Sequence, residues 1–458
     1  MHLPFDTSLF PHTNGVFIVG GSIRDLLCNR TPSDYDVVVK ENPADFALHL
    51  SSKISGRLVK LGKDGQIMWR VIAEDLLFDI TTMNGTTIEE DLLQRDFTVN
   101  AMAMAASTGS LIDPFKGQQD LASQKIRMVS TDVFRKDPVR LVRAYRLAAA
   151  FDFTIEVNTR KILRRDAHLV NQSAGERIRD ELFKILECKA AIVWLSDMAL
   201  SGLLFFVFPE FLVLKNCRFD NADPRDLLEH TFDAYHWLEK LVNSRKLLKK
   251  NSVDTNIQDI GTDRVTLLKW AILFGGLCNP ASHHPAELKS QNADDQALKC
   301  AAQARKICQR LRFSKRQTDT IHLIIANHQQ PFMLFRAKQE NTSYRKAFAR
   351  FFMQCRDLTP DILLYTLAIH LGRKPSFDLD RDEFQNFVQT LIKDYSSKLL
   401  PRASKQLPLT GKDLIQEFGL DPSAEFRHIL ARIEEEHLTR EKLTRKQARR
   451  LVAELINR

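Results

Sequence analysis

Two aspartates, Asp34 and Asp36, stand one residue apart at the start of the apolar run Val37–Val39. Because residues i and i+2 of a strand share a face, both carboxylates are expected on one side of a strand. Two such carboxylates repel each other unless a cation lies between them, and this arrangement can hold Mg²⁺ against a triphosphate. We therefore predict that Asp34 and Asp36 are catalytic metal ligands. The alternative is a solvated turn, which is common for an isolated Asp-x-Asp pair.

A third acid, Asp79, lies between Phe78 and Ile80 in the β-rich run Leu76–Thr81. On an adjacent strand its carboxylate could complete or support the metal site. A capping or edge carboxylate explains Asp79 nearly as well.

A glycine pair precedes these acids. Gly20-Gly21-Ser22 follows the short β-rich run Phe17–Val19 and leads directly into a helical pattern that contains Arg24. Paired glycines allow close backbone approach, a helix N-terminus offers free N–H groups, and an arginine one turn later can reach a phosphate oxygen. The segment is suited to binding phosphate, although a Gly-Gly pair alone is more often just a tight turn.

Further motifs follow in a fixed order along the chain. The ordered set comprises Gly20-Gly21-Ser22-x-Arg24-Asp25, Asp34-x-Asp36, Arg95-Asp96-Phe97-Thr98-Val99-Asn100, Asp113-Pro114-x-x-Gly117, Asp137-Pro138-x-Arg140-x-x-Arg143-x-x-Arg146 and Glu176-Arg177-x-x-x-Glu181. This set resembles the class II tRNA nucleotidyltransferases and bacterial poly(A) polymerases. The resemblance fades after about residue 215, although Leu409–Leu414 resembles the tail motif of that family.

The resemblance implies a polymerase-β-like α+β head, with a small sheet and helices, followed by an all-α neck, body and tail. It implies a transferase with two Mg²⁺ ions as cofactor, which adds nucleotides from CTP or ATP to the 3′ end of tRNA and releases pyrophosphate. Asp34 and Asp36 would hold the metal ions. The nucleotide-binding residues that it implies are Gly20, Gly21, Ser22, Arg24, Arg95, Asp96, Asn100, Asp137, Arg140, Arg143 and Arg146.

Asp137, Arg140, Arg143 and Arg146 recur at intervals of three residues, a spacing that predicts one broad helix face. A solvated basic face is the alternative. In the family that the chain resembles, an aspartate and an arginine at the positions of Asp137 and Arg140 select the incoming base without a nucleic-acid template. A guanidinium fork and a carboxylate can together pair with the edge of cytosine or adenine.

Two residues depart from the family pattern. Lys136 stands where the family usually has glutamate, and Gln94 stands where it usually has the first of two arginines. Since Asp137 is kept, base selection is expected to be intact, while Gln94 puts a secondary contact in doubt.

The interval between Asp79 and Arg95 is short and contains no Arg, Tyr or Pro. Relatives that build the whole CCA end have a longer, flexible loop there, and relatives that lack it add only CC. We therefore predict CC addition, with a separate A-adding enzyme completing the end. The alternatives are full CCA addition, A addition, poly(A) synthesis and, more remotely, an RNA-binding protein with an inactive head.

The elements that must position these residues divide the chain into four parts. Five β-rich runs alternate with helical patterns in the head: Phe17–Val19, Asp36–Val39, Arg57–Leu61, Met68–Ile72 and Leu76–Thr81. From about residue 120 onward the apolar spacing is helical, with no convincing strand. We predict a nucleotidyltransferase head (1–135), a helical neck with the base-selecting helix (136–215), a helical body (216–395) and a helical, basic tail (396–458).

Some bacterial members of the family that the chain resembles carry a His-Asp phosphohydrolase domain behind the nucleotidyltransferase core. Ala271–Cys278 is the segment that comes nearest to their metal motif, and it places Phe274 and Gly275 where the ligands would stand. His230, His236 and His328 have no partner in the sequence pattern. We therefore predict a degenerate region without a metal site, which serves as scaffold and RNA platform.

Composition fits this interpretation. The chain has 458 residues with 44% hydrophobic and 27% charged residues, which excludes a mini-protein and wholesale disorder. Its net charge of +9 favours a polyanionic partner, and the basic excess lies behind the head and culminates in Arg440–Arg458. Met1–Gly15 does not resemble a secretion signal, and Met198–Phe208 is too short to span a membrane, so no membrane partner and a cytoplasmic location are expected.

Overall fold

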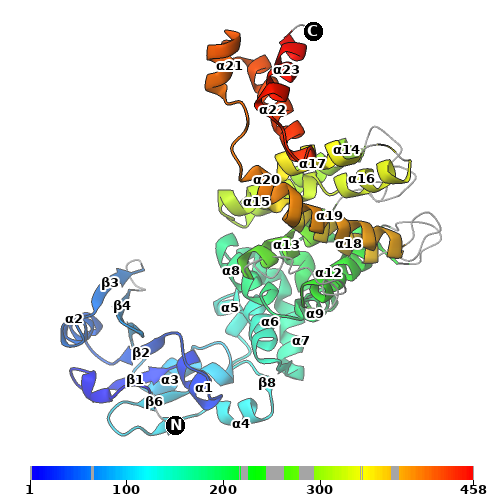
Figure 1. Cartoon of the computed structure of the whole chain (residues 1–458). Coiled ribbons are helices and arrows are strands. Elements are labelled where there is room, and N and C mark those ends of the chain that lie inside the picture. The colour runs from blue at the N-terminus through cyan, green and yellow to red at the C-terminus, as the bar shows by residue number, and fades with distance from the viewer. Residues whose placement is uncertain are drawn as a thin grey trace. The chain divides into compact units, whose positions relative to one another are not determined.

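The computed structural model describes residues 3–62, 67–215, 217, 225–243, 262–277, 293–340, 342, 344–372 and 381–456. Its contacts divide the chain into two compact units (Figure 1). The first comprises Met1–Cys188 and Val193–Val207, and the second comprises Lys189–Ile192 and Phe208–Arg458. The four-part division of the chain stays a prediction.

The first unit contains a mixed sheet that has seven strands among the described residues, in the order β3-β4-β5-β2-β1-β6-β7. These strands are β1 (Val16–Val19), β2 (Tyr35–Val39), β3 (Arg57–Leu61), β4 (Met68–Ala73), β5 (Leu76–Thr82), β6 (Ala103–Ala105) and β7 (Leu111–Ile112). Strands β2 and β5 pair in parallel, whereas the other neighbours are antiparallel. All five predicted strands are present, within one residue at each end.

The two faces of strand β2 have different environments. Tyr35, Val37 and Val39 belong to a buried cluster that also includes Phe46 and Leu50 of helix α2 (Pro43–Lys53). Val38 belongs to a second cluster with Ile88 and Leu92 of helix α3 (Ile88–Leu93). Because alternate residues share a face, Asp36 lies on the side of Val38 and α3, opposite α2.

Helix α3 follows β5 after a turn of only five residues, Met83 to Thr87. The Thr87 hydroxyl caps the helix by accepting a hydrogen bond from the amide of Glu90. Glu89, Glu90 and Asp91 place acidic side chains in its first turn, where they complement the helix dipole. The short connection therefore ends in a well-defined helix that carries Gln94 and Arg95 at its C-terminal end.

Helices fill the remainder of the first unit. They are α1 (Gly21–Leu27), α4 (Gly117–Ala122), α5 (Val133–Lys136), α6 (Arg140–Phe151), α7 (Val157–Asp166), α8 (Gly175–Leu186), α9 (Ala191–Leu200) and α10 (Leu203–Val207), with short 3₁₀ turns at Thr7–Leu9, Thr98–Asn100 and Ala167–Gln172. One expectation was wrong here: β8 (Lys125–Ile126) and β9 (Thr154–Ile155) form a small parallel pair within the region predicted to be wholly helical. Two-residue strands bury too few side chains to leave a periodic pattern in the sequence.

The described part of the second unit is helical. Its helices are α11 (Phe211–Lys215), α12 (Leu227–Asn243), α13 (Thr262–Gly275), α14 (Ala293–Arg310), α15 (Lys315–Ala326), α16 (Gln330–Gln339), α17 (Tyr344–Cys355), α18 (Thr359–Gly372), α19 (Arg381–Asp394), α20 (Leu400–Ala403), α21 (Gly411–Phe418), α22 (Ala424–Thr439) and α23 (Arg445–Ile456), with a 3₁₀ turn at Arg356–Leu358 and a π-helical turn at Tyr395–Leu399. Helices α21 to α23 enclose their own small core around Leu414, Ile433 and Val452. None of the described helices is both long and apolar enough to cross a bilayer.

Candidate active site

The candidate catalytic carboxylates lie at the central strand β2, with Asp36 on the strand and Asp34 just before it. Asp36 is paired with Val19 of β1 on one side and with Asp79 of β5 on the other. Asp34 is exposed immediately before β2, and its carboxylate accepts a hydrogen bond of 2.8 Å from the hydroxyl of Ser33. The side chain of Asp36 keeps 46% of its surface exposed, so a ligand can reach it.

The pKa of Asp36 is raised to about 6. Burial of the carboxylate against the sheet is the largest cause, and the neighbouring charges of Asp34 and Asp79 raise the pKa further, while Arg95 opposes them. An unpaired carboxylate that is costly to ionise gains most when a cation binds beside it.

Asp79 has a different environment. It is 5% exposed, and both of its carboxylate oxygens accept hydrogen bonds of 2.7 Å from the guanidinium of Arg70 on the adjacent strand β4. This bidentate pair occupies Asp79, so its predicted support of the site is an electrostatic one through Asp36. The sequence pattern did not single out Arg70.

A divalent cation fits the remaining pair of acids. Among the described residues no group of three or more His, Cys, Asp and Glu side chains is close enough to form a complete protein metal site. Asp34 and Asp36 each expose a carboxylate, and the charge of Asp34 acts on Asp36. Mg²⁺ is typically held by one or two carboxylates together with substrate phosphates. The two aspartates thus suit an ion that is shared with a nucleotide.

The glycine turn lies next to these acids. Gly20 has a φ of +77°, and a Cβ atom there would lie 2.7 Å from Nη1 of Arg95 and 2.9 Å from Oδ2 of Asp36. The hydroxyl of Ser22 donates to the carbonyl of Val19 at 3.0 Å and closes the turn. Only glycine can therefore occupy position 20 without displacing the acidic site.

Arg24 is buried beneath this turn instead of projecting from it. Its guanidinium lies 4.5 Å from the centre of the Phe151 ring, donates to Asn100 at 2.6 Å and pairs with Asp25 at 2.8 Å. In this arrangement Arg24 braces α1. A direct contact with a triphosphate, as the sequence resemblance implies, stays a prediction.

Arg95 connects α3 with the acidic site. Its guanidinium donates to Asp91 at 3.2 and 3.3 Å, and its Nη1 lies 3.9 Å from Oδ2 of Asp36. Asp91 is 3% exposed and was not among the predicted site residues. Its spacing of four residues before Arg95 is the signal that could have identified it.

Asp96 and Asn100 belong to a network of buried hydrogen bonds. Asn100 donates to Asp96 at 2.9 Å, and Nη1 of Arg143 donates to the other oxygen of Asp96 at 3.3 Å. Burial alone would raise the pKa of Asp96, but Arg143 and the hydrogen bonds outweigh burial and lower it.

The network continues into the neck through Glu181 of α8. Arg143 and Arg146 donate to its two oxygens at 2.8 and 3.0 Å, and Glu181 is only 6% exposed. These two arginines thus join helices α6 and α8, and their role as nucleotide ligands stays a prediction. Glu181 stood in a quoted motif but was not assigned to the site.

The structure corrects the placement of the base-selecting residues. Asp137 does not lie on the helix: it follows α5 in an extended conformation, and α6 begins only at Arg140, because Pro138 interrupts the helical pattern. Both oxygens of Asp137 accept hydrogen bonds from Arg177, at 2.9 and 2.8 Å.

Arg140 stands 3.7 Å from Asp137, and its Nη2 donates to the backbone carbonyl of Gln94 at 2.9 Å. Its Nε and Nη1 are buried and have no hydrogen-bond partner among the described residues. Burial lowers the pKa of Arg140 from its ordinary value. Two unsatisfied donors on a buried guanidinium are unusual in a folded protein.

The region around Phe274, predicted from the sequence to be a degenerate phosphohydrolase-like domain, has an aromatic core. Phe274 packs against Trp270, Phe208 and Phe313, with ring centroids 5.1 to 6.4 Å apart. His328 is buried, and its ring nitrogens contact the carbonyl of Ile325 and the side chain of Gln329. Cys278, the last residue of the predicted segment, lies outside the described residues.

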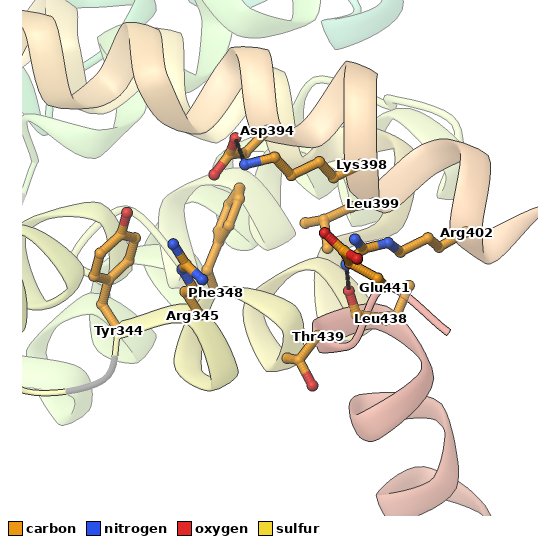
Figure 2. Close-up of a pocket in the computed structure, with 10 residues that line it drawn as sticks. All are labelled: Tyr344, Arg345, Phe348, Asp394, Lys398, Leu399, Arg402, Leu438, Thr439 and Glu441. Carbon is orange, nitrogen blue, oxygen red and sulfur yellow. Dashed lines mark hydrogen bonds and ion pairs between the residues drawn. The ribbon is translucent and has the colours of Figure 1, made fainter. Parts of the chain in front are cut away.

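A pocket of about 250 Å³ lies elsewhere in the second unit, between α17, the turn Tyr395–Leu399 and the end of α22. Figure 2 shows charged and aromatic side chains around it, including Tyr344, Arg345 and Glu441. Lys398 pairs with Asp394, and Arg402 donates to the carbonyl of Leu438.

The basic C-terminal segment is largely paired within the protein. Arg440 pairs with Glu436, Arg445 and Arg449 both pair with Glu417, and Arg450 pairs with Glu454. Arg458 lies outside the described residues. The excess charge that this segment offers to a polyanion is therefore smaller than its sequence suggests.

Comparison with known proteins gives two family matches. Residues 16–127 match the poly A polymerase head domain, and residues 152–214 match the family described as the probable RNA and SrmB-binding site of polymerase A.

Curated relatives agree with these matches. The chain is 37% identical over 195 residues to a CC-adding tRNA nucleotidyltransferase of Geobacter sulfurreducens, a match that covers 42% of this chain and 45% of the relative. It is 27% identical to a CC-adding tRNA nucleotidyltransferase of Synechocystis, with 95% and 92% covered. It is also 28% identical to an A-adding tRNA nucleotidyltransferase of Deinococcus radiodurans, with 96% of both chains covered.

Solved structures show the same fold. A CCA-adding enzyme of Thermotoga maritima in complex with tRNA superposes with a TM-score of 0.62 at 21% identity, over 96% of this chain and 91% of that one. A CCA-adding enzyme in complex with CTP gives a TM-score of 0.64 at 20% identity, over 97% and 91% of the two chains. The motifs, the mixed-sheet head followed by helices, and these matches together place the chain in the family of tRNA nucleotidyltransferases and bacterial poly(A) polymerases.

Proposed function

We propose that this protein adds CC to the 3′ end of tRNA, using CTP and releasing pyrophosphate, as a cytoplasmic enzyme. The observation that carries the transferase assignment is the accessible pair Asp34 and Asp36 beside a glycine turn and Arg95, with two unused donors of Arg140 in the same unit. In the reaction, the terminal 3′ oxygen forms a bond to the α-phosphorus, and the bond to the bridging oxygen of the pyrophosphate leaving group breaks.

Asp34 and Asp36 would hold two Mg²⁺ ions. The bound ions would activate the terminal hydroxyl and neutralise charge on the triphosphate. The protein's own residues orient the substrate: Gly20 keeps the turn open, and Arg95, anchored by Asp91, presents a cation beside Asp36. Gly21, Ser22 and Arg24 would form and brace the turn that receives the phosphates.

Arg140 and Asp137 would read the incoming base. The carboxylate is held by Arg177, and the guanidinium keeps Nε and Nη1 without partners among the described residues. A fixed carboxylate and a fork of donors can match the acceptor and donor edge of cytosine. Buried donors left unpaired by a wrong base would make that base costly to bind.

The preference for CC over CCA rests on the connection between β5 and α3. It is five residues long, and its backbone is tied to α3 by hydrogen bonds from Asn84 to Asp91 and from Thr86 to Glu90. A segment held in this way has little freedom to reshape the base pocket between CTP and ATP. Two of the relatives named above are CC-adding enzymes, whereas one is A-adding, so A addition is the second candidate.

Incorporation assays distinguish these activities. CTP and ATP, separately and together, are supplied with Mg²⁺ to tRNA transcripts that end before CCA, after C and after CC. We expect CTP addition that stops at CC and no addition to the CC-ending transcript. Efficient ATP addition to that transcript would indicate a CCA- or A-adding enzyme, and long A tracts on unrelated RNA would indicate a poly(A) polymerase. Asp34→Ala should abolish every activity, and activity retained in this variant would contradict the mechanism.

A further inference from the structure

Gln94 makes two contacts with residues 136–140, the base-reading segment, which carries the proposed base-reading residues Asp137 and Arg140. Its backbone carbonyl accepts a hydrogen bond of 2.9 Å from Nη2 of Arg140, and its side-chain Oε1 accepts one of 2.9 Å from Nζ of Lys136. Lys136 and Arg140 are four residues apart on the same segment, on either side of Asp137. Gln94, at the end of α3, is therefore hydrogen-bonded to both ends of the segment 136–140.

These contacts bear on the direction of the Arg140 guanidinium. A guanidinium is a rigid planar fork, so fixing one nitrogen restricts the directions in which the others can donate. Nη2 is fixed on Gln94, while Nε and Nη1 have no hydrogen-bond partner in the described part of the chain. The Gln94 carbonyl, together with the carboxylate of Asp137 at 3.7 Å, therefore restricts the tilt of the guanidinium that would meet the base.

Residue 94 is itself held from two sides. The next residue, Arg95, is anchored by Asp91 and faces Asp36 at 3.9 Å, which ties this turn to the catalytic strand. On the other side, among the described residues, the side chain of Gln94 is linked to residues 136–140 by the bridge from Lys136, and its backbone carbonyl is linked to them by Arg140. If the bridge is lost, residue 94 is still connected to Asp36 through Arg95, but it keeps only one of its two hydrogen bonds to residues 136–140.

The bridge joins two side chains that are 42 residues apart in sequence. The bridge is exposed at both ends, so its contribution to the free energy of unfolding is expected to be small, and its effect is expected on geometry.

We propose that the Lys136–Gln94 bridge is a positioning device that sets the tilt of Arg140 and thereby the choice between CTP and ATP. The inference rests on the proposed function, since it assumes that Arg140 reads the base. Lys136 and Gln94 act through Arg140 and need not touch the nucleotide themselves.

The test uses the full-length protein with the variants Lys136→Met, Gln94→Leu and the double variant. Both changes remove one polar end of the bridge and keep side-chain bulk, and Gln94→Leu leaves the backbone carbonyl in place. The ratio of kcat/KM for CTP to that for ATP is measured on a C-ending tRNA transcript, together with Tm. Lys125→Met, a change at an exposed lysine of β8, is the matched control.

We expect each single variant to lower the CTP-to-ATP ratio threefold or more with Tm unchanged, and the double variant to lower it no further than either single change. The exchanged pair Lys136→Gln with Gln94→Lys should restore the ratio, because it rebuilds the hydrogen bond in the opposite direction. Lys125→Met should keep the original ratio.

Other results would overturn the inference. An unchanged ratio in both single variants, or effects that multiply in the double variant, would show that the bridge does not position Arg140. A fall in the ratio that only accompanies a fall in Tm, without rescue by the exchanged pair, would show a merely structural role. If the original protein incorporates neither CTP nor ATP, the proposed function fails first, and this result is distinct from an active enzyme whose variants keep its selectivity.

Discussion

Asp36 and Asp79 are direct partners in the parallel pairing of β2 with β5, yet their carboxylates have opposite surroundings. Asp79 is buried in a bidentate pair with Arg70, whereas Asp36 is partly exposed and makes a longer ion pair with Arg95, at 3.9 Å. The negative charge of Asp79 therefore lies close to the carboxylate of Asp36. This asymmetry helps to raise the pKa of Asp36, after burial and together with Asp34, and marks Asp36 as the acid that would gain most from a bound cation.

The raised pKa of Asp36 predicts an acid limit to activity. Because that pKa is about 6 without a bound cation, kcat/KM for CTP at limiting Mg²⁺ should fall as the pH drops through about 6. Asp79→Asn removes a negative charge that raises the pKa of Asp36, and it frees Arg70, whose positive charge lowers that pKa. The acid limb of the pH profile of kcat/KM should therefore move to lower pH. Asp75→Asn, at an exposed position of the β4–β5 turn, should leave the limb in place. A limb that stays fixed or moves upward in Asp79→Asn would contradict this account.

The raised pKa of Asp36 also predicts how the free energy of unfolding changes with pH. The folded protein holds the Asp36 proton more tightly than the unfolded chain, whose ordinary value is 3.8. In the metal-free protein, Asp36 therefore contributes a free energy of unfolding that is fully present below pH 3.8 and is lost as the pH rises through about 6. In urea denaturation across this range, the original protein should lose stability relative to Asp36→Asn as the pH rises. A difference between the two proteins that does not change with pH would contradict a raised pKa.

Gly20 offers a test of how closely the turn fits the acidic site. Gly20→Ala places a methyl group within 3 Å of both Arg95 and Asp36, and we expect a loss of activity of about 100-fold, since misplacing reacting groups by about 1 Å has effects of that order. Gly109→Ala is the matched control, because Gly109 also has a positive φ, +68°, but has no atom within 4 Å of its added Cβ. Both variants should lose about 1 kcal/mol of stability from backbone strain. Equal activity in the two would show that the close contact at Gly20 is unimportant.

The sequence predicted the sheet of the head well and its polar contacts poorly. Val37 to Val39 are β-branched and buried, so the strand was evident, and Asp36 could be placed on the opposite face from Val37 by alternation alone. Arg70 lies nine residues from Asp79 and could not be paired with it, because that contact depends on which strands are neighbours. Sheet order is a tertiary property that local patterns do not contain.

The neck shows the same limit in another form. A spacing of three residues suggested one continuous helix from Asp137 to Arg146, but Pro138 disfavours the helical conformation for the residue before it, and α6 begins at Arg140. Likewise the shared contact of Arg143 and Arg146 with Glu181, which lies 35 to 38 residues later, could not be read from the sequence, and their predicted role as nucleotide ligands stays a prediction. The motif indicated which residues matter, and only the fold shows which of them contact one another.

Glu181 predicts a large effect on stability. Glu181→Gln should lower the free energy of unfolding by about 3 kcal/mol, because it leaves two arginines of α6 facing a buried group that no longer carries a charge. Asp180→Asn on the same helix is the control: its side chain is 60% exposed, and its loss should change the free energy by less than about 0.5 kcal/mol. Urea denaturation of both variants measures their free energies of unfolding. Similar losses for the two variants would show that burial of Glu181 does not strengthen its contribution to stability.

Three consecutive glutamates of α22 contact α17 and the 3₁₀ turn after it. Lys346 lies 2.8 Å from Glu436, Arg350 lies 3.8 Å from Glu435, and Arg356 lies 2.6 Å from Glu434. Glu435 and Glu436 are both less than 5% exposed, which is unusual for glutamate. Burial would raise the pKa of Glu436, but Lys346 and Arg440 outweigh it and hold the pKa below its usual range.

We expect Glu436→Gln to loosen α22 from α17 locally. The side chains of Lys346 and Arg440 are about half exposed and can turn to water, so the cost should be about 1 to 2 kcal/mol and not the full penalty of a buried broken pair. Hydrogen exchange should accelerate in α22 and α17 while strands β1, β2 and β5 keep their protection, because the latter belong to the other compact unit. Glu454→Gln removes an exposed pair with Arg450 at the end of α23 and should change neither. If exchange in α22 is unaffected by Glu436→Gln, the two helices are held together without this ion pair.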